Sequence, residues 1–144
     1  MNILSVYVRF ATLADLEFVQ QDQYLPAEIV RRKVEWQEVV VAEWDGRAAG
    51  YARLEYLWSH VPYLALIRVL PEYQRRGVGQ AMLRYLEEQL CAQGHTALYS
   101  SSQADEPEPQ AWHRRMGFAE CGIIAGINKG GVGEIFFRKL LPEQ

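Results

Sequence analysis

One junction in the sequence constrains the fold more than any other feature. The apolar run YLALIRVL ends at Pro71, and from Val78 apolar residues recur at helical spacing until Gly94. A strand that leads into a helix through a short loop leaves the first N–H groups of that helix without intrahelical partners. These donors, together with the positive end of the helix dipole, favour a bound anion. The junction therefore predicts a phosphate site at the start of a helix.

The loop itself, EYQRRGVGQ, has the composition that such a site needs. Gly77 and Gly79 would let a pyrophosphate approach the backbone, because neither has a Cβ. Arg75 and Arg76 would add positive charge, although a tight turn with solvated arginines is the alternative. The loop lacks both the Lys-Ser/Thr pair of a P-loop and the G-x-G-x-x-G dinucleotide pattern, so those two nucleotide sites are excluded.

The remaining pattern predicts a strand-rich sheet covered by helices, with the element order βααβββαβαββ. Thr12 and Asp15 resemble a capping box, and Asp45-Gly46 suits a tight hairpin. The helix after Pro26 carries Arg31 to Lys33 on a face that we expect to be solvated. Expected strands are 5–10, 38–44, 47–58, 63–70, 96–100, 118–127 and 132–140, expected helices are 13–19, 26–36, 78–94 and 109–116, and 101–109 is expected to be a polar loop.

The size and the charge of the chain limit the classes of protein to which it can belong. A chain of 144 residues suits one compact domain, so we expect a single domain over 1–144. The formal net charge of −3 argues against a nucleic-acid partner, which requires a basic surface. No apolar run reaches the about 18 residues of a membrane helix, and the first residues lack the pattern of a signal peptide. We therefore expect a cytoplasmic protein with no membrane partner.

The two cysteines predict neither a disulfide framework nor a metal site. Cys91 and Cys121 are too few and too widely spaced for either. We expect both to be buried, reduced thiols with no role in the chemistry, and we expect no metal.

Two motifs together resemble a known family. The string IRVLPEYQRRGVGQA, residues 67–81, resembles the acyl-CoA-binding signature of the GNAT superfamily of N-acetyltransferases. WHRRMGF, residues 112–118, resembles the second signature of that family, and the element order matches over nearly the full chain. The resemblance implies the α+β GNAT fold, a mixed central sheet of six to seven strands with helices on both faces. It also implies acetyl-CoA as cofactor and a primary amine as acceptor.

The resemblance assigns the cofactor contacts to main-chain groups. Val69 would contact the pantetheine arm, and its N–H would donate to the thioester oxygen as negative charge develops there. The pyrophosphate would be held by the loop and the helix start, namely Gln74, Arg75, Arg76, Gly77, Val78, Gly79 and Gln80.

The catalytic side chains depart from the pattern of the family. His113 occupies the position where the family usually has a tyrosine that protonates the leaving thiolate. Imidazolium could serve as that acid, and water is the competing proton donor. Residues 63–70 contain no carboxylate to act as base, so Glu55 is the nearest candidate, with His60 behind it. An exposed strand position beside Arg53 is the alternative reading of Glu55.

The acceptor side is less defined. The family usually has an asparagine before the second signature, and Ser100 to Gln103 are the candidates to replace its contacts. Tyr56, Trp58 and Trp112 could line an amine site, but aromatic residues at strand spacing are more often core. The family layout would wall this site with the first two helices, residues 58–60 and the hairpin 128–133.

Two functions therefore remain open. The first is acetyl transfer to the primary amine of a small molecule, with a protein amine as a less favoured acceptor. The second is a non-catalytic acyl-CoA-binding or regulatory module, which the missing tyrosine, asparagine and strand carboxylate would suit. The resemblance also suggests a homodimer.

Overall fold

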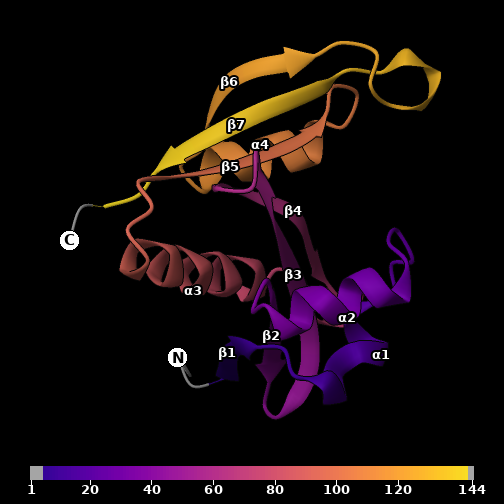
Figure 1. Cartoon of the computed structure of the whole chain (residues 1–144), viewed down its shortest axis with the longest axis vertical. Helices are drawn as coiled ribbons and strands as arrows, with labels where there is room; N and C mark the ends of the chain where they lie inside the picture. The colour runs from indigo at the N-terminus through magenta and orange to yellow at the C-terminus, as the bar shows by residue number, and fades with distance from the viewer. Residues whose placement is uncertain (1–4, 143–144) are drawn as a thin grey trace. The chain divides into compact units, whose positions relative to one another are not determined.

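A computed structural model describes residues 5–142 of the chain (Figure 1). The helices are α1 (Leu16–Val19), α2 (Ala27–Glu35), α3 (Val78–Ala92) and α4 (Pro107–Arg115). The strands are β1 (Val6–Phe10), β2 (Val39–Trp44), β3 (Arg47–Leu57), β4 (Val61–Val69), β5 (Ala97–Gln103), β6 (Ala119–Ile124) and β7 (Glu134–Leu140). This order confirms the predicted succession of strands and helices.

The strands form one mixed sheet in the order β1-β2-β3-β4-β5-β7-β6. β4 and β5 run parallel, with Tyr63 opposite Tyr99 and Leu64 opposite Ser100. The pairs β1–β2, β2–β3, β5–β7 and β6–β7 are antiparallel. The predicted α+β class is confirmed, and the seven strands observed agree with the predicted mixed sheet of six to seven.

The chain divides into two compact units. The first contains Met1–Leu54 and Leu66–Gln89, and the second contains Glu55–Ala65 and Leu90–Gln144. The cofactor loop predicted from the sequence lies in the first unit, and His113 lies in the second. The single domain over 1–144 stays a prediction, and each unit is described by itself.

In the first unit, α1 and α2 cover one face of the strands. Val41 on β2 lies opposite Tyr51 on β3, and both side chains are fully buried. They join a core cluster with Val19 of α1 and with Val30 and Val34 of α2. Because side chains alternate between the two faces of a strand, the neighbours of Val41 and Tyr51 must point to the other face.

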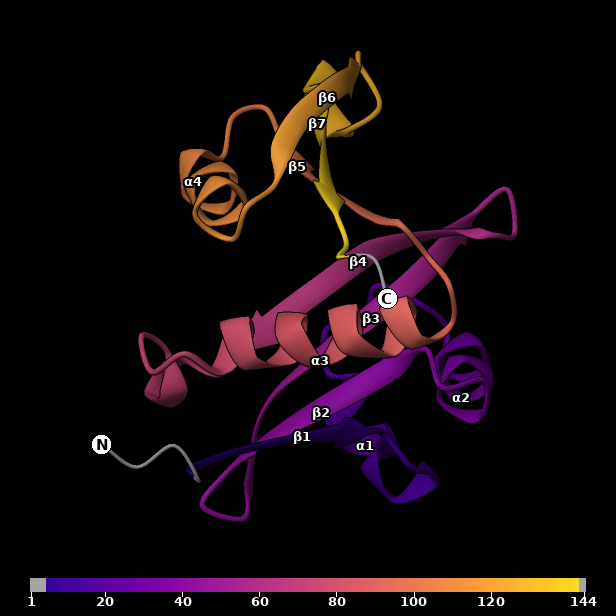
Figure 2. The ribbon, with the colours of Figure 1, turned by 90° about the vertical axis from the view of Figure 1, so that its left-hand side faces the viewer.

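The helix α3 covers that other face, as Figures 1 and 2 show. Gly50 lies opposite Ala42, and a Cβ on Gly50 would come within 3.1 Å of the Met82 side chain of α3. The ring of Phe10 on β1 packs edge-on against Tyr85 of α3, with centroids 5.4 Å apart. In this unit the sheet therefore has helices on both faces, as predicted.

In the second unit, α4 packs against β5 and β7. The His113 ring of α4 stacks on Phe137 of β7, with centroids 4.6 Å apart and planes 7° apart. Leu98 of β5 and Phe137 are fully buried. An aromatic stack thus fixes the helix that carries the second sequence motif.

Three local predictions were wrong. β5 extends to Gln103 where a polar loop was expected, because Ser101, Ser102 and Gln103 pair with β7. Tertiary pairing here outweighs the weak strand preference of serine. Lys33 was expected to be solvated, but it is 6% exposed, and its Nζ donates to the Leu54 carbonyl oxygen at 2.6 Å. Cys121 is exposed on β6, where a buried thiol was expected.

The described residues contain no helix that is long and apolar enough to cross a membrane.

The predicted capping box is confirmed, since the Thr12 N–H donates to the Asp15 carboxylate at 2.8 Å.

Candidate active site

The end of β4 presents a backbone donor on the edge that faces away from β3. The Leu70 N–H donates to the Ala49 carbonyl oxygen at 2.8 Å. In an antiparallel pair the backbone groups of successive residues point to opposite edges, so the N–H and C=O of Val69 point away from β3. The Gln74 side chain confirms this direction, because its Nε2 donates to the Val69 carbonyl oxygen at 3.2 Å. At the end of β4, the Val69 N–H therefore points in a direction in which it can donate a hydrogen bond to a ligand.

The loop after β4 leaves the first turn of α3 open. Arg75 and Gly77 have φ of 63° and 79°, in the left-handed region that favours glycine. The Ala81 N–H makes the first intrahelical bond, to the Gly77 carbonyl oxygen at 3.0 Å. The N–H groups of 78–80 precede this bond and have no acceptor within the helix. A Cβ on Gly77 would meet no atom within 4 Å, so the space above the helix start can admit a ligand.

The charges around this turn suit an anion. The first turn of α3 has no acidic residue. Arg75 and Arg76 are both exposed, and the Arg76 guanidinium lies over the Trp44 ring at 5.2 Å and near Tyr73 at 6.0 Å. Such contacts hold a cation in place without neutralising it. The loop therefore suits a bound anion, with Arg76 held on the side of β2.

His113 is buried and both of its ring nitrogens are engaged. Nδ1 lies 2.8 Å from the Pro109 carbonyl oxygen, and Nε2 lies 2.7 Å from Ser100 Oγ. The side chain is 4% exposed. Burial lowers the pKa of His113 below its ordinary value, although the hydrogen bond to Pro109 opposes this effect. Near neutral pH the imidazole is therefore mostly uncharged, and its predicted role as general acid stays a prediction.

A chain of hydrogen bonds links three strands of the second unit. Tyr63 Oη on β4 lies 2.5 Å from Ser101 Oγ on β5. Ser101 Oγ donates to Glu134 Oε2 on β7 at 2.6 Å, and Asn128 Nδ2 donates to Glu134 Oε1 at 2.8 Å. Tyr63 also stacks on Phe136, with ring centroids 5.8 Å apart. The sequence did not reveal this chain, because Ser101 was assigned to a loop and Glu134 to an unremarkable strand.

The other predicted side chains of the second unit differ in exposure. Glu55 on β3 is half-buried, and its negative charge acts on Tyr63. Trp58 is 82% exposed in the turn after β3. Tyr56 and Trp112, expected to be core, are half-buried. The structure therefore brings Glu55 close to the Tyr63 chain, and its predicted role as base stays a prediction.

A buried ion pair fixes the segment after α1. Asp22 makes two hydrogen bonds to the Arg53 guanidinium, at 2.7 and 2.9 Å, and accepts a third from Tyr51 at 2.7 Å. Burial alone would raise the pKa of Asp22, but the bonds from Arg53 and Tyr51 outweigh it and hold that pKa below its usual range. Burial and Asp22 raise the pKa of Tyr51 to about 12.

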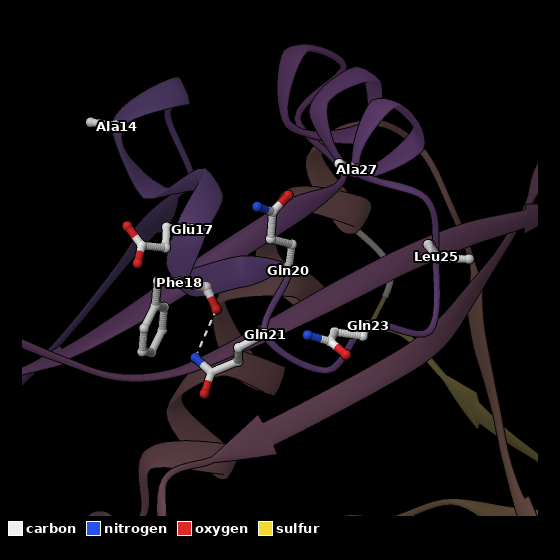
Figure 3. A pocket seen from close by; sticks show the side chains of 8 residues that line it. All are labelled: Ala14, Glu17, Phe18, Gln20, Gln21, Gln23, Leu25 and Ala27. Atoms are coloured by element: carbon white, nitrogen blue, oxygen red, sulfur yellow. Dashed lines mark hydrogen bonds between the residues drawn. The ribbon is translucent and has the colours of Figure 1, made fainter.

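Beside this ion pair, an open hollow of about 850 Å³ lies along α1 and the start of α2 (Figure 3). Its side chains are mainly amides and apolar groups, and Gln21 Nε2 donates to the Phe18 carbonyl oxygen at 2.7 Å. The lining residues are Ala14, Glu17, Phe18, Gln20, Gln21, Gln23, Leu25 and Ala27. Among residues 5–142, no group of three His, Cys, Asp or Glu side chains could hold a metal ion.

The chain belongs to the acetyltransferase (GNAT) family, whose model matches residues 7–118. This match includes both sequence motifs and the whole of the loop described above. The resemblance that the two motifs indicated is therefore confirmed.

Two curated relatives act on small molecules according to their names. Streptothricin acetyltransferase of Streptomyces lavendulae is 29% identical over 92 residues, which cover 62% of this chain and 48% of that protein. The chain thus spans about half the length of this relative. S-alkylcysteine N-acetyltransferase of Bacillus subtilis (strain 168) is 23% identical over 126 residues, covering 81% of this chain and 70% of that protein.

Solved structures share the fold over nearly the full chain. Ard1 from Thermoplasma volcanium matches with a TM-score of 0.83 at 14% identity, covering 96% of this chain and 99% of that one. The protein yncA from Salmonella typhimurium, solved with its cofactor acetyl-CoA, matches with a TM-score of 0.74 at 18% identity, covering 97% and 96%. The GNAT fold is confirmed.

Proposed function

We propose that this protein transfers an acetyl group from acetyl-CoA to the primary amine of a small molecule. The observation that carries the proposal is the direction of the Val69 N–H, away from β3 and next to a loop whose open helix start suits a pyrophosphate. The names of the two curated relatives, which specify streptothricin and S-alkylcysteine, support a small-molecule acceptor over a protein amine.

Each predicted site residue has one role in this proposal. Acetyl-CoA supplies the thioester that the amine attacks. The N–H groups of 78–80 and the loop residues Gln74 to Gly77 bind the pyrophosphate, with Arg75 and Arg76 adding positive charge. The Val69 N–H donates to the thioester oxygen as negative charge develops on it. His113 or water returns a proton to sulfur. A cytoplasmic location and a homodimer belong to the same proposal.

The test follows free thiol release from acetyl-CoA in the presence of a panel of amines that includes an S-alkylcysteine. We expect turnover above the hydrolysis blank, and a loss of kcat in His113→Phe if the histidine is the acid. Acetyl-CoA binding without turnover on any amine would instead support a non-catalytic acyl-CoA-binding module.

A further inference from the structure

We propose that Arg68, the residue before Val69 on β4, binds the carboxylate of the acceptor and so selects small α-amino acids as substrates. The inference rests on the proposed acetyl transfer and names the chemical class of the amine. In an α-amino acid a single carbon atom separates the amine from the carboxylate. A cation next to the Val69 donor can therefore hold the carboxylate while the amine attacks the thioester.

The Arg68 side chain lies on the face of the sheet that α1 and α2 cover. The Leu70 N–H donates to the Ala49 carbonyl oxygen, so these two residues are opposite each other. Two positions away on each strand, Arg68 is opposite Tyr51, and both side chains point to the same face. Leu66, on that face by the same alternation, packs against the core cluster that contains Tyr51. The opposite face carries α3, so Arg68 points away from the helix whose first turn would bind the pyrophosphate.

Tyr51 orients the Arg68 guanidinium. The ionised Asp22 carboxylate only accepts, so the single hydroxyl hydrogen of Tyr51 goes to Asp22. The Tyr51 oxygen is left to accept, and the Arg68 guanidinium donates to it. The charge of Asp22 is already paired, since its carboxylate accepts two hydrogen bonds from Arg53.

The positive charge of Arg68 is open to a ligand. Arg68 is exposed, and it takes part in no ion pair among residues 5–142. A guanidinium has five N–H donors in a planar fork that matches the two oxygens of a carboxylate. The contact with Tyr51 uses only part of that fork, so the rest can bind an acidic group.

The hollow along α1 and the start of α2 offers space for the rest of such a ligand (Figure 3). The Phe18 ring, which lines the hollow, packs edge-on against Tyr51, with centroids 5.5 Å apart. Asp22 belongs to the segment 20–23, whose other residues line the hollow. Its carboxylate bonds to the same Tyr51 oxygen that Arg68 contacts. Tyr51 thus connects the wall of the hollow to Arg68.

The lining of the hollow suits an uncharged substrate side chain. Glu17 is the one charged side chain among the lining residues, and it would repel an acidic group. The amides of 20, 21 and 23 and the apolar groups of Phe18 and Leu25 make up most of the remainder. The acceptor is therefore an α-amino acid that places its carboxylate at Arg68 and an uncharged side chain in the hollow.

Arg68→Met tests the contact, because it removes the charge and keeps a long side chain. The probes are leucine, methionine, glutamine and S-methylcysteine, each compared with its own carboxamide at the same concentration of neutral amine. In the wild type we expect kcat/KM to favour an amino acid over its carboxamide. In Arg68→Met this preference should fall roughly 10- to 100-fold, because a hydrogen bond between charged groups is lost. The change should lie in the KM for the amino acid, with the KM for acetyl-CoA unchanged.

Arg68→Lys should keep part of the preference, since lysine retains the charge without the planar fork. Arg32→Met is the matched control: it removes an exposed arginine from α2 and should leave the preference unchanged. Circular dichroism and acetyl-CoA binding report whether each variant folds. Should Arg68→Met fail to fold, Arg68→Gln carries the test, because the amide can still donate to Tyr51.

The outcomes separate this contact from the proposed function. If the wild type acetylates amines but prefers no amino acid to its carboxamide, the contact is wrong and the acetyl transfer stands. The same conclusion follows if Arg68→Met keeps the wild-type preference, or loses equal activity with the amino acid and the carboxamide. A wild type that binds acetyl-CoA and acetylates no amine overturns the proposed function, and the contact with it.

Discussion

The Nδ1 atom of His113 lies 2.8 Å from the carbonyl oxygen of Pro109, and this contact determines which ring nitrogen carries the proton. A carbonyl only accepts, so Nδ1 must donate and Nε2 of the neutral ring must accept. The Ser100 hydroxyl, 2.7 Å from Nε2, is the donor. Protonating Nε2 would reverse that bond and turn the Ser100 hydrogen towards the Leu64 carbonyl oxygen, 3.2 Å away.

The first prediction concerns stability at mildly acidic pH. Because burial places the pKa of His113 below its ordinary value of 6.5, the unfolded chain binds a proton more readily than the folded one. This histidine therefore contributes stability above pH 6.5, and the contribution is lost as the pH falls through the lower folded pKa. The melting temperature of the wild type should decline over this range. In His113→Gln the decline should be shallower, and the exposed His60→Gln should behave as the wild type does.

The second prediction concerns the buried pair of Asp22 and Arg53. Their side chains are 1% and 3% exposed, so removing one partner leaves an uncompensated charge. Arg53→Met should lower the free energy of unfolding by about 3–5 kcal/mol, and Asp22→Asn combined with Arg53→Met should restore part of it. Urea titration measures both values.

The same ion pair predicts that the stability of the fold decreases in strong acid. The folded pKa of Asp22 lies below 3.8, so its contribution is present above pH 3.8 and is lost as the pH falls further. In the double variant this part of the acid sensitivity should disappear. An unchanged acid profile would mean that another carboxylate dominates.

The third prediction uses the close approach of Gly50 to the end of β4. A Cβ at this position would lie 2.6 Å from the Arg68 carbonyl oxygen and 3.3 Å from the Val69 Cα. Gly50→Ala must therefore displace the strand end that presents the Val69 N–H. We expect a loss of about 1–3 kcal/mol in stability. We also expect a fall of roughly 100-fold in kcat, because a shift near 1 Å misplaces the donor.

Gly122→Ala is the control for that substitution, since a Cβ there would meet no atom within 4 Å. It should leave both stability and kcat near wild-type values. Wild-type kcat in a folded Gly50→Ala protein would contradict the role assigned to Val69.

The sequence predicted the helices and strands and the glycine-containing loop between β4 and α3 because both depend on local patterns. The pattern from Tyr63 to Gly94 predicts a strand, a loop and a helix from neighbouring residues alone. Contacts between residues far apart in the sequence produce no such local pattern. Lys33 looks solvated on its helix because the Leu54 carbonyl that binds it lies 21 positions away. Ser101 became a strand residue through pairing with Phe136, a partner that the polar run around it does not indicate.

The candidate side chains also fall into two groups: those within a sequence motif could be predicted, and those brought together only by the fold could not. His113 could be found because it replaces a tyrosine within a motif. Tyr63 and Glu134 are instead linked by hydrogen bonds through Ser101, and the three residues come from three separate strands. Asp22 looked like part of an ordinary turn, and Arg53 like a neighbour of Glu55. Their pairing requires the turn after α1 to lie against β3, which no local pattern encodes.

The last prediction separates backbone strain from blocked space at Gly77. Its φ of 79° is costly for most side chains, by about 1–2 kcal/mol, but asparagine tolerates this region better. Gly77→Asn should therefore keep the loop conformation and weaken acetyl-CoA binding only modestly, as its side chain enters the space where the pyrophosphate would lie. Gly77→Val adds strain and bulk. Calorimetry should detect no acetyl-CoA binding to this variant, while its melting temperature should fall by only a few degrees. Undiminished acetyl-CoA affinity in Gly77→Val would show that the pyrophosphate does not bind at the start of α3.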